Sequence, residues 1–214
     1  ILSALALAPR KRLEHWQLME ALHEDSGSYT TAALGVRIVT DGQVERFDEV
    51  VICMHSDQAL RMLRDPSAAE TNYLSAIKYQ DNVAVLHTDD SVLPARRKAW
   101  AAWNYARAES VDQESARVCL HYLLNKLQPL PYQQAVVVSL NPTQTIDPNK
   151  IIRTLDYAHP VFDQAAIDAQ QHMHQIQGQQ RTWYAGAWLG YGFHEDGLKS
   201  GLAVARELLL KVHA

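Results

Sequence analysis

The 214-residue sequence has few of the features that mark secreted, collagenous or nucleic-acid-binding proteins. Its two cysteines, Cys53 and Cys119, are too few for a disulfide scaffold and lie in apolar runs, which predicts buried thiols in a cytoplasmic protein. A net charge of -4 provides no basic excess for a phosphate backbone, so we expect no nucleic-acid partner. Glycine and proline number nine and eight, too few for a collagenous or low-complexity chain.

The start of the sequence also lacks a long apolar run. Only eight apolar or small residues precede Pro9, which is too short a stretch to span a bilayer. The basic residues at 10–12 follow this stretch, whereas in a signal peptide they come first. We therefore expect no transmembrane segment. Because the first residue is isoleucine rather than methionine, we expect a processed product or a part of a longer chain.

Hydrophobic residues make up 47% of the sequence, enough for a sizeable core, and their spacing predicts an α/β protein. The unbroken run at 50–54 predicts a strand buried on both faces, and an Asp-Gly pair at 41–42 predicts a hairpin before it. Ser56 and Asp57 are expected to cap the helix that follows. Helices are predicted at 10–25, 57–65, 67–77 and 162–178.

Strand-like runs dominate the middle of the chain. They follow one another without long helices between them, which favours an antiparallel sheet. The runs lie at 82–87, 100–105, 117–127, 135–140 and 151–157. Trp100, Trp103 and Tyr105 are expected to pack in the core of this sheet, or else to line a substrate cavity.

The C-terminal part concentrates glycine: five of the nine lie within sixteen residues, at 186, 190, 192, 197 and 201. A short apolar strand at 183–185 precedes them, and a helical pattern begins at Asp196. Glycines let a backbone approach a ligand closely, and a helix N-terminus offers unpaired N–H groups to an anion. Residues 186–197 are therefore predicted to form a strand-to-helix cofactor loop.

The run TWYAGAWLGYGFHEDGLKSGLAVARELL at 182–209 resembles the C-terminal flavin motif of the FAD-dependent amine oxidoreductases, which include monoamine oxidases, protoporphyrinogen oxidases and phytoene desaturases. Together with FDEVVICMHSDQAL at 47–60 and YAHPVFD at 157–163, it is similar to a bacterial branch described as predicted NAD/FAD-binding, amine-oxidase-like proteins. This resemblance runs from about residue 34 to the end of the chain.

The resemblance implies the C-terminal portion of a glutathione-reductase-type FAD domain with an inserted α+β substrate domain that has an antiparallel sheet. Residues 1–58 and 180–214 would belong to the FAD domain and 59–179 to the substrate domain. The implied cofactor is FAD, with the turn at 194–197 bringing the last helix to the flavin N1 and O2. The implied contact residues are Gly186, Ala187, Trp188, Gly192, Phe193, His194, Glu195, Asp196, Gly197 and Leu198.

Three departures from the family pattern matter. The fingerprint G-x-G-x-x-G is absent, since Gly190-Tyr191-Gly192 is the only G-x-G. Ala187 and Trp188 stand where many members have a carboxylate for the ribityl chain. Val83 and Val85 lie where amine oxidases often present a lysine to flavin N5 through a water, so amine oxidation is not favoured over a lipid-like substrate.

The expected activity is hydride transfer from a small, apolar, amine or lipid-like substrate to the flavin. The alternative is a truncated remnant or a binding module that cannot hold FAD alone. His194, Glu195 and Asp196 can also be read as a helix-capping cluster. No catalytic residue and no metal site is assigned, because His172 and His174 are two apart on a predicted helix and do not face each other. The sequence is also compatible with a homo-oligomer.

The purified chain should be colourless or contain less than one equivalent of flavin. The pyrophosphate site supplies much of the binding in dinucleotide folds, and its glycine fingerprint is missing from this sequence. The visible absorption spectrum checks this, and the absorbance of a full equivalent of oxidised flavin would contradict it.

Overall fold

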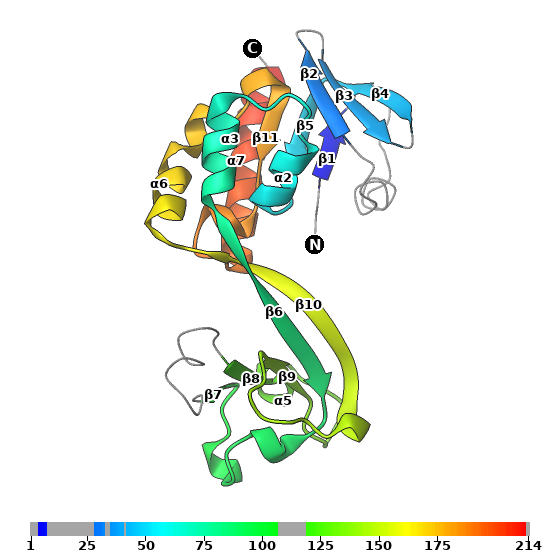
Figure 1. Ribbon diagram of the computed structural model, residues 1–214, viewed down its shortest axis with the longest axis vertical. Coiled ribbons are helices and arrows are strands. Elements are labelled where there is room, and N and C mark those ends of the chain that lie inside the picture. Colours follow the sequence, from blue (N-terminus) through cyan, green and yellow to red (C-terminus); the bar gives the residue numbers. More distant parts are fainter. Residues whose placement is uncertain (1–3, 8–27, 33–34, 41, 107–118, 213–214) are drawn as a thin grey trace. The chain divides into compact units, whose positions relative to one another are not determined.

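The computed structural model describes residues 4–7, 28–32, 35–40, 42–106 and 119–212. The chain forms two compact units, one made of Ile1–Tyr79 with Pro160–Ala214 and the other of Gln80–His159 (Figure 1). The domains expected from the sequence had different boundaries, after residues 58 and 179. Which unit serves a cofactor and which a substrate stays a prediction, and the helix expected at 10–25 lies outside the described residues.

The first unit is organised around a three-stranded sheet in the order β1-β5-β11. Strand β5 (Glu49–Ile52) pairs in parallel with β11 (Thr182–Tyr184), and β1 (Ala4–Leu7) pairs with the other edge of β5 antiparallel. All four residues of β5 are buried, which confirms the expectation of a strand covered on both faces.

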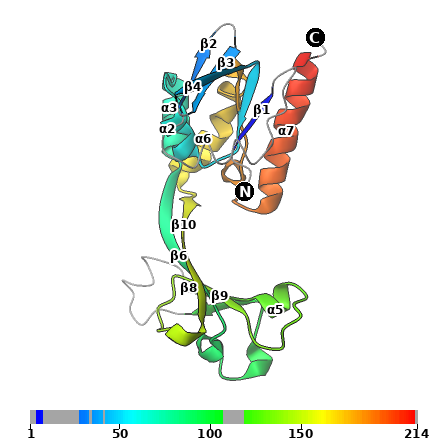
Figure 2. The same ribbon diagram turned by 90° about the vertical axis from the view of Figure 1, so that its right-hand side faces the viewer.

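Helices cover both faces of this sheet, as Figure 2 shows for α7 on one side and α2, α3 and α6 on the other. Successive strand side chains point to opposite faces. Ile52 and Tyr184 accordingly pack in the core on the side of α2, α3 and α6, whereas Val51 and Trp183 pack against α7. The helix bounds are α2 Ser56–Met62, α3 Ala68–Ala76, α6 Gln164–His172 and α7 His194–Val212.

A second, antiparallel sheet completes this unit, made of β2 (Ser28–Ala32), β3 (Gly35–Thr40) and β4 (Gln43–Phe47). Thr40 pairs with Gln43, and Gly42 has a φ of 76°, so the expected hairpin is confirmed. Val36 and Phe47 bury this sheet against the same core as α2, α3 and α6.

The N-terminus of α3 is satisfied by a capping box. The Ser67 hydroxyl accepts from the Glu70 backbone N–H, and Glu70 accepts from the Ser67 backbone N–H at 2.8 Å. The second oxygen of Glu70 accepts a hydrogen bond of 2.7 Å from the Tyr184 hydroxyl, which joins α3 to β11. The cap expected for α2 is wrong: His55 is its N-cap without a side-chain hydrogen bond, and Ser56 lies inside the helix.

The second unit holds a five-stranded sheet in the order β10-β6-β9-β8-β7. The pairs β6–β9, β9–β8 and β8–β7 are antiparallel, as expected from the succession of strands. One face carries an apolar cluster that includes Val85, Leu123 and Val137. The strand bounds are β6 Lys78–His87, β7 Trp103–Ala106, β8 Cys119–Leu123, β9 Val137–Leu140 and β10 Ile151–Val161.

Several expected elements differ in extent or burial. The strand expected up to residue 127 ends at Leu123 and is followed by the short helix α5 (Leu124–Leu127), while the helix expected at 162–178 is broken after His172. The expectation that Trp103 and Tyr105 pack in the core is wrong, since these side chains are 56% and 58% exposed. Strand β7 is the edge of its sheet and buries the opposite face, so aromatic content alone misassigned these two residues.

Tyr184→Phe should lower the free energy of unfolding by about 1.5–3 kcal/mol, because it removes the hydroxyl that donates to the buried Glu70 carboxyl. Urea unfolding followed by circular dichroism measures the change. The matched control is Tyr73→Phe, which removes a hydroxyl bonded to Gln175 at an exposed site and should cost less than about 0.5 kcal/mol. Equal losses in the two variants would contradict the role given to Glu70.

Candidate functional site

The carboxyl ends of β5 and β11 lie at the same edge of the first sheet, because the two strands are parallel. In α/β sheets, ligands bind outside the carboxyl ends of parallel strands. Two hydrogen bonds of 2.9 Å hold the emerging segments together, from the Ala185 N–H to the Ile52 carbonyl and from Trp188 Nε1 to the Met54 carbonyl. This edge is therefore the first place to look for a binding site.

The segment after β11 has the expected strand–loop–helix order. Gly186 leads into a single 3-10 turn at Ala187–Leu189, and α7 begins at His194 rather than at Asp196. The N–H groups of the first helical turn, at His194 and Glu195, have no intrahelical carbonyl partners. The predicted loop at 186–197 is thus confirmed as a structural element, while its contact with a cofactor stays a prediction.

Two polar side chains that the sequence did not single out hold this loop. Ser200 Oγ accepts from the Gly186 N–H at 2.9 Å and donates to the Gly197 carbonyl at 2.8 Å. The Gln170 side-chain amide donates to the carbonyls of Trp188 and Gly190, both at 2.8 Å. Ser200 lies on the predicted C-terminal helix and could have been suspected there, but Gln170 comes from α6, and no local pattern reveals its partners.

Asp196, in the first turn of α7, holds the loop that precedes the helix. Its Oδ2 accepts from the backbone N–H groups of Phe193 at 3.0 Å and Tyr191 at 3.1 Å. The expectation that Asp196 satisfies the first N–H groups of the helix is wrong, because the groups that its carboxylate binds precede the helix. Glu195 instead pairs with Lys199 on the exposed side of the helix, at 3.8 Å.

The glycines of the loop differ in how much space surrounds the position where a Cβ atom would lie. A Cβ at Gly190 would lie 2.7 Å from the Asp196 Cγ, so packing within the loop requires its absence. At Gly197 a Cβ would meet only the Ala187 backbone and side chain, at 3.6 Å and beyond, which is ordinary contact. Glycine inside a helix lowers stability by about 0.5–1 kcal/mol relative to alanine. No contact among the described residues requires glycine at position 197.

Of the predicted site residues, Trp188 is buried and supports the loop from inside. Phe193 and Leu198 are 62% and 58% exposed, beside Tyr191 at 82%. The structure thus brings the predicted residues onto one loop and the first turn of one helix. Their positions are Gly186, Ala187 and Trp188 at the 3-10 turn, Gly192 and Phe193 before the helix, and His194, Glu195, Asp196, Gly197 and Leu198 within it.

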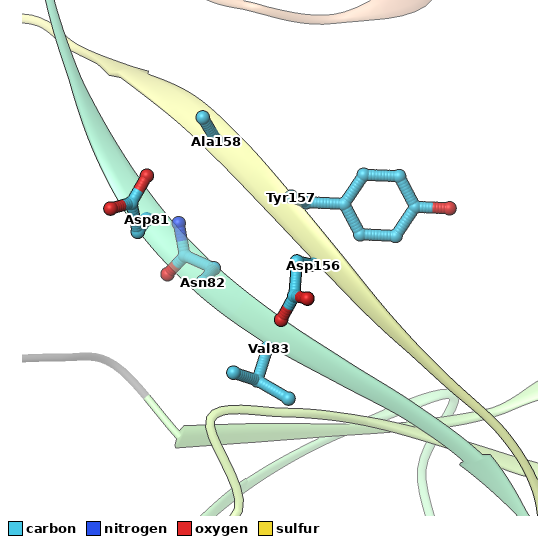
Figure 3. A pocket seen from close by; sticks show the side chains of 6 residues that line it. All are labelled: Asp81, Asn82, Val83, Asp156, Tyr157 and Ala158. Carbon is cyan, nitrogen blue, oxygen red and sulfur yellow. The ribbon is translucent and has the colours of Figure 1, made fainter.

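The second unit has a hollow of its own, about 440 Å³ in volume, on the surface of strands β6 and β10. Figure 3 shows Asp81 and Asp156 on the neighbouring strands, with the Tyr157 ring directed outward. Asn82, Val83 and Ala158 complete the lining. None of the residues predicted for cofactor binding belongs to it.

Within the described residues, no group of three or more His, Cys, Asp or Glu side chains could hold a metal ion. None of the helices that the structure describes is long and apolar enough to cross a membrane.

No family model and no curated protein matches this chain. Solved structures do. The CLA-producing fatty acid isomerase from P. acnes aligns over 85% of this chain and 47% of its own, with 17% identity and a TM-score of 0.59. A redesigned putrescine oxidase aligns over 92% and 52%, with 9% identity and a TM-score of 0.57, and cyclohexylamine oxidase from Brevibacterium oxydans over 86% and 49%, with 11% identity and 0.53.

These structures share the fold of the FAD-dependent, amine-oxidase-like flavoproteins, and the resemblance seen in the sequence is confirmed at the level of the fold. The fold is a mixed α/β arrangement with an antiparallel sheet. The chain spans about half the length of the solved structures it matches.

Gly190→Ala should destabilise the protein by about 1–3 kcal/mol, because the added methyl group would press on Asp196, which two backbone N–H groups hold in place. Gly201→Ala, in α7, is the control, since nothing lies within 4 Å of its Cβ position. It should be neutral or stabilise by up to about 1 kcal/mol. Thermal unfolding of both variants decides, and a Gly190→Ala variant as stable as Gly201→Ala would refute the packing argument.

Proposed function

We propose that the chain supplies the flavin-end half of an FAD site in an oxidoreductase of the amine-oxidase-like flavoproteins. The observation that carries the proposal is the loop between β11 and α7, built at the carboxyl edge of two parallel strands in a fold that these flavoproteins share. The first unit would be part of a glutathione-reductase-type FAD domain. The Gln80–His159 unit would belong to the substrate domain.

The residues present fit the flavin end of FAD. Gly197 leaves space beside Ala187 that a side chain would fill, on the first turn of α7. The N–H groups of that turn and the positive end of a 19-residue helix favour a negatively charged group nearby. Bound FAD would supply hydride acceptance, and reduction leaves negative charge near N1 and O2.

Within that proposal, the residues of this chain orient and stabilise. The backbone at His194–Gly197 would face the charged edge of the ring, with Asp196 fixing the geometry of the turn through Tyr191 and Phe193. Ser200 and Gln170 would hold the loop in the same shape with or without ligand. A helix dipole contributes up to about 2 kcal/mol at a partly buried site, which corresponds to roughly 40 mV for a two-electron couple.

We propose a small, apolar substrate. Trp103 and Tyr105 give the second unit exposed aromatic surface, which suits an acyl chain or an apolar amine. Val83 and Val85 on β6 stand where the resemblance would place an amine-oxidase lysine, and this favours a lipid-like substrate. One protein of similar fold is a fatty acid isomerase, which agrees with this preference.

A binding module without activity is the second candidate. The observation that favours it is the missing G-x-G-x-x-G, since that fingerprint grips the pyrophosphate of a dinucleotide. A chain with only the flavin-end contacts would bind FAD weakly. The two candidates therefore differ in whether FAD, once added, is reduced in the presence of substrate.

Gly197→Val should abolish measurable binding of added FAD or weaken it at least tenfold, because the side chain would occupy the space proposed for the edge of the flavin ring. Flavin fluorescence during a titration of the chain with FAD measures the affinity. Gly201→Val is the matched control, one turn away on the same helix with open space around it, and should retain the parent affinity within about twofold.

The unmodified chain should show weak, saturable binding. No saturation at about 1 mM FAD, a concentration that corresponds to only about −4 kcal/mol of binding free energy, would contradict a flavin site on this chain. Equal affinity of the Gly197→Val and Gly201→Val variants would refute the proposed position of the helix start against the ring.

A further inference from the structure

One face of the five-stranded sheet in the second unit buries polar side chains within an apolar core. His87, His121, Ser139 and Cys119 are at most 2% exposed. The register places His121 directly opposite Ser139, on the face that also carries the cluster around Val85, Leu123 and Val137. Imidazole and hydroxyl groups in such surroundings are costly unless they are hydrogen-bonded.

These four side chains form one continuous series of contacts. Ser139 Oγ lies 2.7 Å from His87 Nε2 and 2.6 Å from His121 Nδ1. The other nitrogen of His121 lies 3.7 Å from Cys119 Sγ. At the opposite end, the backbone N–H of Asp89 donates to His87 Nδ1 at 3.1 Å.

The backbone donor at Asp89 sets the direction of the whole series. A ring nitrogen that accepts a hydrogen bond carries no proton, so neutral His87 is protonated on Nε2 and donates to Ser139. The Ser139 hydroxyl then donates to His121 Nδ1, which leaves the proton of His121 on Nε2, toward Cys119. His87 must be neutral for every contact to be satisfied, and a neutral His121 lets the Ser139 hydroxyl accept from one ring and donate to the other.

The His87 end of the series is joined to the start of β10. The buried Asp89 carboxylate accepts from the Asp147 N–H and from Lys150 Nζ, both at 3.0 Å. The Thr88 N–H also donates to the Lys150 carbonyl at 3.0 Å. The hydrogen bond from Asp147 holds the pKa of Asp89 well below its usual range, so this carboxylate stays ionised while histidines titrate.

The other titratable groups that face the two rings are Asp89, Lys150 and Cys119. Burial lowers the pKa of His87, Asp89 opposes this shift, and Lys150 adds to it. Burial also lowers the pKa of His121, and a charge on His87 lowers it further. Cys119 is the remaining titratable group in contact with His121. Both rings are therefore neutral at neutral pH, in agreement with the hydrogen-bond directions.

We propose that the series His87–Ser139–His121–Cys119 is an acid-sensitive switch that holds the end of β6 to the start of β10 and releases it when His87 takes up a proton. Protonated His87 carries hydrogens on both nitrogens, so its Nδ1–H opposes the Asp89 N–H. One donor must move away, and the backbone at Asp89 moves with the carboxylate that anchors Asp147 and Lys150.

The sign of the pH dependence follows from the direction of the shifts. Since the pKa of each ring is lower in the folded than in the unfolded chain, the folded unit binds fewer protons. Its stability is complete above about pH 6.5, the ordinary histidine value. As the pH falls below that value, each ring lowers the folding equilibrium constant by up to about tenfold per pH unit.

The test uses the full chain with ¹⁵N-labelled histidine, from about pH 7.5 to about pH 5, the range in which histidines titrate. Ring ¹⁵N spectra should show His87 and His121 neutral and protonated on Nε2 at the upper pH. Amide-exchange protection of the Thr88 and Asp147 N–H groups, which join the end of β6 to the start of β10, should fall below about pH 6.5 by up to about tenfold per pH unit per ring. Protection in β5 of the other unit serves as the internal control and should change less.

His87→Gln should make the protection of the Thr88 and Asp147 N–H groups less dependent on pH, by up to about tenfold per pH unit. His174→Gln, which removes an exposed imidazole from the other unit, should leave the parent dependence. If His87→Gln does not fold, the ring spectra of the unmodified chain decide. An Nδ1–H form of His87 at neutral pH, or protonation of both rings without loss of protection, would overturn the proposal.

Discussion

The parallel pairing of β5 with β11 is the constraint on which the first unit depends. Two parallel strands cannot be joined by a hairpin, so the chain between Ile52 and Thr182 must leave the sheet and return. That excursion contains the whole Gln80–His159 unit and three of the helices that cover the sheet. The same pairing sets both carboxyl ends at one edge, and the candidate site exists because of this.

The loop at that edge is held mainly by side chains bonded to backbone groups. Gln177 shows the principle at β11: its amide oxygen accepts from the Tyr184 N–H at 2.9 Å and its nitrogen donates to the Tyr184 carbonyl at 2.7 Å. The Gln177 side chain thus forms the two hydrogen bonds that a further strand would form with Tyr184, on the side of β11 that faces away from β5. Gln170, Ser200 and Asp196 do the same for the glycine-rich turn, so its shape is set before any ligand arrives.

The second unit resolves a different conflict. Its sheet buries one face, and two of the residues on that face are histidines, which an apolar core tolerates only when they are neutral and paired. The Ser139 hydroxyl can donate to one ring and accept from the other, which makes serine the residue that reconciles them. The stability of this sheet is therefore tied to a protonation state, whereas the first unit rests on an apolar core and a capping box.

The sequence by itself determined the elements whose signals are local: the apolar run around Val50, the Asp-Gly hairpin, the antiparallel strands and the strand–loop–helix around Gly186. The motif at 182–209 also resembles that of the FAD-dependent amine oxidoreductases, and the fatty acid isomerase structure shares the fold of this chain. Only the tertiary structure decided which distant residues act together. The exposure of Trp103 follows from the edge position of β7, and the support of the loop by Gln170 follows from the packing of α6. Hydrophobic periodicity tells which face of an element is buried, but partners across an interface are chosen by packing, and packing is a property of the whole chain.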